Sequence, residues 1–128
     1  MKPINYREIY QVYSKEISKA DSALKSLDEI CEFFINKIKS GPELKYIGNF
    51  DHYAHTKNIN GEIAANIVGA INVLFCFGKK LPEPMILAVR PRSIGVCETD
   101  THWVISFMEA PNAELTNIMV KWTEELAG

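Results

Sequence analysis

MILAVRPRSIGVCETDTHWVISFMEA, residues Met85–Ala110, is the stretch that decides the fold of this chain. Its apolar alternation predicts three short strands, one of them broken at Arg90–Ser93. A two-residue turn at Asp100-Thr101 would join the other two strands and place Cys97 opposite Val104 and Gly95 opposite Ser106. The residues predicted for the core face are Ile94, Val96, Trp103, Ile105 and Phe107, and those predicted for the opposite face are Cys97, Thr99, His102 and Ser106.

Two amphipathic helices are predicted, one before these strands in the sequence and one after them. Ser26 and Glu29 have the spacing of a capping box, in which each side chain satisfies a free backbone N–H. An apolar stripe follows, and Gly41-Pro42 ends the helix. Asn112 is typical of the residue that caps a second helix near the end of the chain. The two stripes are Leu27, Ile30, Cys31, Phe34 and Ile38, and Leu115, Ile118, Met119, Trp122 and Leu126.

The remaining strands are predicted from composition. Tyr6, Ile9, Tyr13 and Ile17 have helical spacing, but the β-branched and aromatic content near them favours a strand. Leu44 to Thr56 reads as a strand, whereas residues 62–68 fit either a strand or a helical turn. Residues 70–77 are apolar almost throughout, as expected for a strand covered on both faces. The prolines of residues 81–84 predict a hairpin-like connection after it.

These elements predict one α+β domain over residues 1–128. The expected order is strand, helix, four strands and helix, which gives a mainly antiparallel sheet of about five strands with two helices on one face. The 128 residues are 47% apolar and carry a net charge of −2. This balance argues against nucleic acid as a partner, because phosphate binding needs a basic surface. No apolar run approaches the roughly 20 residues of a membrane span, and the first residues lack a signal-peptide core, so no membrane partner is expected.

Arg90-Pro91-Arg92-Ser93 is the string most suggestive of a binding site. Proline keeps Arg90 extended and indicates an edge or a bulge, and residues two apart in an extended chain point the same way. Two guanidinium groups would then form a clamp for a small anion, with Ser93 as a further donor and the strand Asn49–His55 beside them. The predicted ligand-binding residues are Arg90, Arg92, Ser93, Asp51 and His55. The alternative is that both arginines pair internally with Glu98, Glu109 or Asp51.

The histidines offer a second kind of site. His52 and His55 could bind one metal ion or a haem from a helix or a turn, but in a regular strand they would point to opposite faces. A third ligand would come from His102 or Cys97. No specific metal-binding motif is present.

The three cysteines favour reduced thiols, and therefore a cytoplasmic protein, over a disulfide framework. Cys97 and His102 are too far apart on the predicted hairpin, roughly 7–8 Å, for direct contact between a nucleophile and its base. No reaction is identified. The sequence leaves three hypotheses: a binding module for a small anion, a metal or haem protein, and an interaction protein that forms a homodimer through an edge strand or a helix and has no small-molecule site.

Overall fold

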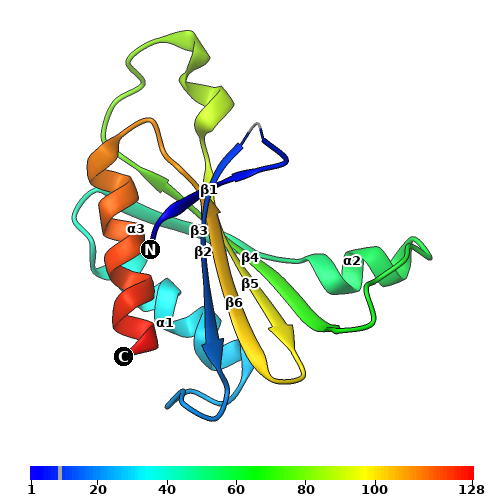
Figure 1. Cartoon of the computed structure of the whole chain (residues 1–128). Coiled ribbons are helices and arrows are strands. Elements are labelled where there is room, and N and C mark those ends of the chain that lie inside the picture. Colours follow the sequence, from blue (N-terminus) through cyan, green and yellow to red (C-terminus); the bar gives the residue numbers. More distant parts are fainter. Residues whose placement is uncertain (9) are drawn as a thin grey trace.

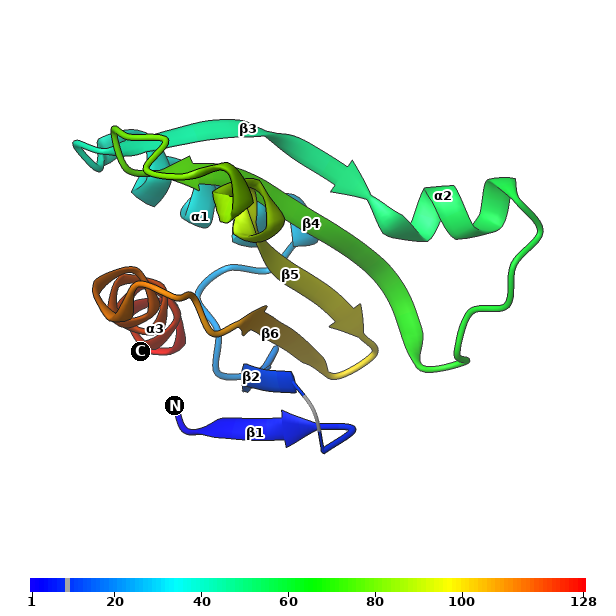
Figure 2. The same cartoon turned by 90° about the horizontal axis from the view of Figure 1, so that it is seen from above.

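Six antiparallel strands form one sheet, and two helices cover one of its faces (Figures 1 and 2). The computed structural model describes residues 1–8 and 10–128, so Ile9 lies outside the described residues. The sheet order is β1-β2-β6-β5-β4-β3. The strands are β1 (Pro3–Tyr6), β2 (Tyr10–Ser18), β3 (Leu44–Asp51), β4 (Ile67–Phe77), β5 (Arg92–Thr99) and β6 (His102–Met108). The helices are α1 (Leu27–Ser40), α2 (His52–Asn58), a 3-10 helix η1 (Pro84–Val89) and α3 (Ala113–Ala127).

The predicted α+β class is confirmed, with six strands instead of about five. The additional strand is β1, which pairs with β2 through the first residues of the chain. The segment that could have been a helix is strand β2, which pairs along its length with β6. No helix among the described residues is long and apolar enough to cross a bilayer.

The β5–β6 hairpin has the predicted register. Cys97 pairs with Val104 and Gly95 with Ser106 across the turn at Asp100-Thr101. All five residues predicted for the core face are buried, and Trp103 and Ile105 have no exposed surface. This hairpin therefore supplies the centre of the hydrophobic core, which α1 and α3 cover.

Both long helices begin at the predicted caps. Ser26 Oγ accepts a hydrogen bond from the Glu29 amide at 3.1 Å, while Glu29 Oε2 accepts from the amide of Lys25 at 3.3 Å, one residue before the expected partner. Asn112 Oδ1 accepts from the Glu114 amide at 2.8 Å at the start of α3. Capping by these side chains satisfies amides that have no partner within the helix, which fixes where each helix starts.

The predicted strand Leu44–Thr56 is wrong beyond Asp51, where the chain turns into helix α2. Asp51 is the N-cap of α2, and its Oδ1 accepts from the Ala54 amide at 2.9 Å. A bulge between Tyr46 and Gly48 also shifts the alternation within β3. The aromatic composition of this stretch suggested a strand, but a local capping interaction stops the strand and starts a helix.

Three further expectations need correction. Residues 85–89 form η1 and not a strand, because Glu83 Oε2 caps the Met85 amide at 2.8 Å and Pro84 stands at the first helical position. Pro91 precedes β5, an interior strand, so it marks neither an edge nor a bulge. Strand β4 is buried on one face only: Val73 and Phe75 are fully buried, whereas the residues on its other face are half-buried because no helix covers that side.

Candidate anion-binding cavity

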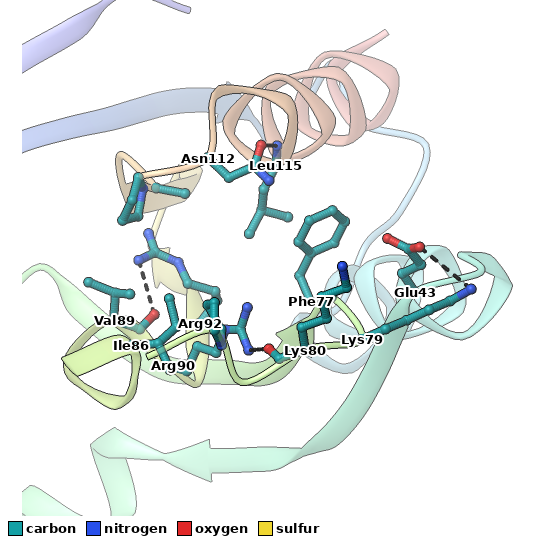
Figure 3. Close-up of a pocket in the computed structure, with 14 residues that line it drawn as sticks. Glu43, Phe77, Lys79, Lys80, Ile86, Val89, Arg90, Arg92, Asn112 and Leu115 are labelled. Carbon is teal, nitrogen blue, oxygen red and sulfur yellow. Dashed lines mark hydrogen bonds and ion pairs between the residues drawn. The ribbon is translucent and has the colours of Figure 1, made fainter. Parts of the chain in front are cut away.

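A cavity of about 350 Å³ lies between the β4–β5 connection and the first turn of α3 (Figure 3). Four cationic side chains and one carboxylate contribute to its wall, and most of the other lining residues are apolar. The charged lining residues are Lys79, Lys80, Arg90, Arg92 and Glu43; the apolar ones are Phe77, Pro82, Ile86, Val89, Ala110, Pro111 and Leu115, and Gly78 and Asn112 complete the wall. The cavity therefore has an apolar body with an excess of positive charge.

Arg90 is held against the backbone of the connection. Its Nη1 donates to the carbonyl of Lys80 at 2.6 Å. Gly78 lies beneath the guanidinium: a Cβ at this position would stand 3.2 Å from Arg90 Nη2, and its φ of +96° is a conformation that favours glycine. Figure 3 shows the guanidinium beside Lys80, on the wall opposite Leu115. A glycine is thus required where the chain turns under Arg90.

Arg92 is the more deeply placed of the two arginines. Its Nη2 donates to the carbonyl of Met108 at 2.6 Å, and its Nη1 donates to the carbonyl of Val89 at 3.4 Å. Its Nε is buried and has no hydrogen-bond partner among the described residues. Burial lowers the pKa of Arg92, because desolvation disfavours the charged form.

Neither cavity arginine forms an ion pair with a carboxylate in the part of the chain that the structure describes. The alternative of internal pairing to Glu98, Glu109 or Asp51 is therefore wrong. Glu98 instead pairs with Lys19 at 2.7 Å. The only acid in the cavity wall, Glu43, stands 3.7 Å from Lys79 Nζ. Among the described residues, the two backbone-anchored guanidinium groups therefore have no carboxylate partner.

Three of the five predicted ligand-binding residues lie elsewhere. Ser93 follows Arg92 in β5 and so faces the other side of the sheet, where its Oγ accepts from Asn72 Nδ2 at 2.9 Å. Asp51 pairs with Ile71, far along β4 from Phe77, which lines the cavity. His55 lies beyond Asp51 on α2. The strand Asn49–His55 is therefore not beside the arginines.

Helix α2 brings two of the three histidines together. The ring centroids of His52 and His55 are 5.9 Å apart, and both rings pack against Phe50, at 5.2 Å and 5.4 Å. His102 lies in the sheet at the β5–β6 turn, where its Nδ1 is 2.8 Å from Thr101 Oγ1. No group of three or more potential metal ligands occurs among residues 1–8 and 10–128. For the metal hypothesis, His52 and His55 are therefore two adjacent potential ligands, and His102 lies on a different element.

The cysteines are all free thiols. Burial, with a smaller contribution from Glu98, raises the pKa of Cys97. Burial raises the pKa of Cys31 to about 12. A nucleophilic cysteine needs a lowered pKa, so the thiol-nucleophile role finds no electrostatic support at Cys97.

Sequence reasoning missed the lysines and the α3 residues of the cavity wall. Strands β4 and β6 both run antiparallel to β5, so both finish at the end of the sheet where β5 begins. Residues 78–80 follow β4, and residues 110–112 follow β6, which brings both next to Arg90 and Arg92. The predicted hairpins contain a signal for this arrangement. Antiparallel strands joined by hairpins bring segments that are far apart in sequence to the same end of the sheet.

Comparison with known proteins gives a family and no activity. The model of DUF6858, a family of unknown function, matches residues 1–128. No curated protein and no solved structure matches the chain. The chain belongs to the DUF6858 family.

Proposed function

Because membership of this family assigns no activity to the chain, we propose from the cavity's chemistry that it binds a small anionic molecule with an apolar portion. The proposed site is the cavity between the β4–β5 connection and α3, with Arg90 and Arg92 as the anion-binding residues. Lys79 and Lys80 add positive charge at the wall, and the N-terminal turn of α3 adds the positive end of a helix dipole.

The observation that carries the proposal is a pair of guanidinium groups that have no carboxylate partner in the part of the chain that the structure describes. Charged groups inside a folded protein are normally paired, because removing a charge from water costs free energy. Arg92 is half-buried, and its partners within the described chain are the carbonyl oxygens of Val89 and Met108, with no partner there for its buried Nε–H. A carboxylate or phosphate would accept hydrogen bonds from such donors in the planar geometry that guanidinium offers.

The walls indicate what else the ligand contains. A volume of about 350 Å³ lies at the lower end of the range of ligand pockets. Phe77, Ile86 and Leu115 enter the cavity from three different elements. These side chains suit an aliphatic or aromatic group better than a highly hydroxylated one, so we expect a compact, amphipathic anion such as a hydrophobic carboxylate or an organic phosphate.

Substitution of the cavity arginines tests this function. We expect Arg90→Gln and Arg92→Gln each to weaken binding of benzoate or inorganic phosphate by at least about tenfold, since a hydrogen bond to a charged group contributes that much. Binding would be followed by chemical-shift titration of the residues lining the cavity. Arg7→Gln is the matched control, because Arg7 is exposed and stacks on Tyr6 at the other end of the chain.

Two results would count against the proposed function. One is a wild-type protein whose cavity resonances respond to neither probe. The other is equal loss of binding in Arg7→Gln and in the cavity variants, which would reflect net charge and not a site.

A second candidate function is homodimer formation through the uncovered face of the sheet. A groove of about 620 Å³ lies there, and its exposed apolar side chains are Ile4, Tyr6, Tyr10 and Met108. Its other lining residues are Val12, Ser14, Val104, Ser106 and Phe107. Apolar patches of this kind often mark interaction sites, and the nearby edge strand β1 supports the same role. The three free thiols fit the reducing environment of the cytoplasm.

Sedimentation velocity tests the dimer. We expect the wild type to sediment as a dimer at micromolar concentration and Met108→Lys to sediment as a monomer, because a buried unpaired charge opposes association. Ile59→Lys, at the far end of α2, serves as the control for an added surface charge. A wild type that sediments as a monomer would exclude this function.

A further inference from the structure

Three large apolar side chains stand uncovered on the β4–β5 connection. Met85 is 78% exposed, Leu81 76% and Leu87 67%, which are the highest values among large hydrophobic residues in the described chain. Figure 1 shows this connection projecting from one end of the molecule, past the start of α3. We call these three residues the apolar tip. Their exposure is unfavourable in water, so a surface that covers them would be stabilised by their burial.

The exposure of two tip residues, Met85 and Leu87, is a consequence of how η1 is built, whereas Leu81 lies three residues before this turn. Glu83 caps the turn through the Met85 amide, and Pro84 fixes its first residue. Within this turn Ile86 and Val89 line the cavity, while Met85 and Leu87 face solvent. Because this ordered turn directs Ile86 and Val89 into the cavity, Met85 and Leu87 remain on the outside of the connection.

Positive charge collects at the base of the tip. Lys79 and Lys80 immediately precede Leu81, and Arg90 follows η1. The nearby acids are Glu43, which lies 3.7 Å from Lys79, and Glu83, whose carboxylate is used as the cap. Since the chain as a whole has a net charge of −2, this local positive excess is not a property of the entire surface.

We propose that the β4–β5 connection docks onto an anionic lipid bilayer. Leu81, Met85 and Leu87 enter the interfacial region, and Lys79 and Lys80 lie at the level of the lipid phosphates. A projecting apolar tip above a basic base matches the layers of a membrane surface, in which hydrocarbon lies beneath anionic headgroups. None of the three tip residues lines the anion-binding cavity, whereas Lys79 and Lys80 belong to both surfaces. The apolar tip is therefore the part of the docking surface that can be changed without altering the cavity.

Docking of this kind needs no membrane-spanning helix, since a few inserted side chains and a basic patch bind reversibly. Composition alone suggested no membrane partner, because the exposed residues are interrupted by Pro82 and Pro84 and form no long apolar run. The relevant signal is spatial: apolar exposure and positive charge meet on one connection.

Co-sedimentation of the full chain with lipid vesicles tests the proposal. We expect the wild type to pellet with vesicles of phosphatidylcholine and phosphatidylserine, and to pellet much less with phosphatidylcholine alone or at high salt. The combined variant Leu81→Ser, Met85→Ser and Leu87→Ser should lose at least about tenfold in vesicle affinity, since burial of even one such side chain contributes that much.

The matched control replaces three other exposed apolar residues. Ile47→Ser, Ile59→Ser and Val68→Ser together remove side chains that are 52%, 64% and 43% exposed and lie outside both the tip and the proposed dimer groove. This variant should pellet like the wild type. Circular dichroism should show both triple variants folded, and Met85→Ser alone replaces the tip variant if that one unfolds.

Three outcomes would overturn the docking proposal. The wild type could remain in the supernatant with anionic vesicles, which would point to a protein as the occupant of the tip. The control variant could lose as much affinity as the tip variant, or neutral vesicles could bind as well as anionic ones. Because the tip variant leaves Arg90 and Arg92 intact, loss of docking and loss of anion binding in the cavity are distinguishable.

Discussion

Trp103→Ala is expected to lower the free energy of unfolding by about 3–5 kcal/mol, the usual cost of truncating a buried large aromatic side chain. Trp103 has no exposed surface and lies in the core that β5, β6, α1 and α3 share. Since domains of this kind are stable by about 5–15 kcal/mol, such a loss removes much of the margin. Urea denaturation followed by circular dichroism measures it without depending on tryptophan fluorescence.

Trp103→Phe is the informative companion to this change. The indole Nε1–H of Trp103 is buried without a hydrogen-bond partner among the described residues, and an unpaired buried donor is unfavourable. Phenylalanine removes that donor and keeps an aromatic face beneath Lys19 Nζ, which lies 4.9 Å from the indole centroid. We therefore expect a clearly smaller loss than for alanine. Equal losses in the two variants would show that the volume of the indole outweighs its unpaired N–H.

The second large effect is a loss of stability at alkaline pH that depends on Cys31. This side chain is 3% exposed on the core side of α1. Burial, and to a lesser degree Asp28, Asp51 and Glu32, raises the pKa of its thiol from 9.0 to about 12. Above pH 9 the unfolded chain releases this proton and the folded chain keeps it. The free energy of unfolding should therefore fall by about 1.4 kcal/mol per pH unit between the two pKa values.

The comparison with Cys31→Ala isolates this contribution, because lysines and tyrosines titrate in the same range in both proteins. At pH 8 the variant should be less stable, since it leaves a small cavity. From about pH 9 upward the difference in the free energy of unfolding between the two proteins should shrink and then change sign. The reason is that ionisation of Cys31 stabilises the unfolded state of the wild type alone. Parallel stability curves for the two proteins would contradict the raised pKa.

Much of the fold was predictable because its signals are local. The β5–β6 register followed from a two-residue turn, and both long helices began at side chains that cap them, Ser26 and Asn112. The errors came where a local cap competes with composition. Asp51 and Glu83 each start a helical turn inside a stretch whose aromatic or β-branched content favours a strand.

The candidate site was less predictable, because it depends on which strand ends meet. Arg90 and Arg92 were recognisable as a potential clamp from their own spacing, and both line the cavity. Their neighbours were not, since Leu115 reaches the arginines only through the order of strands in the sheet. Asp51 was predicted near them because the strand Asn49–His55 was expected beside the arginines, whereas only the first residues of β3 approach that end.

The pairing of β2 with β6 has a consequence for how the chain acquires its structure. Strands β3 to β6 are neighbours in the sheet and consecutive in the chain, so each pairs with the next through a far shorter connection than the one that separates β2 from β6. Strand β2 must instead wait for β6, which lies near the other end of the sequence. During synthesis the N-terminal hairpin therefore emerges long before its partner does, and β6 exposes a free edge until the two meet. Closure of this long-range pair should set the folding rate, and the interval before it is when association with other chains is most probable.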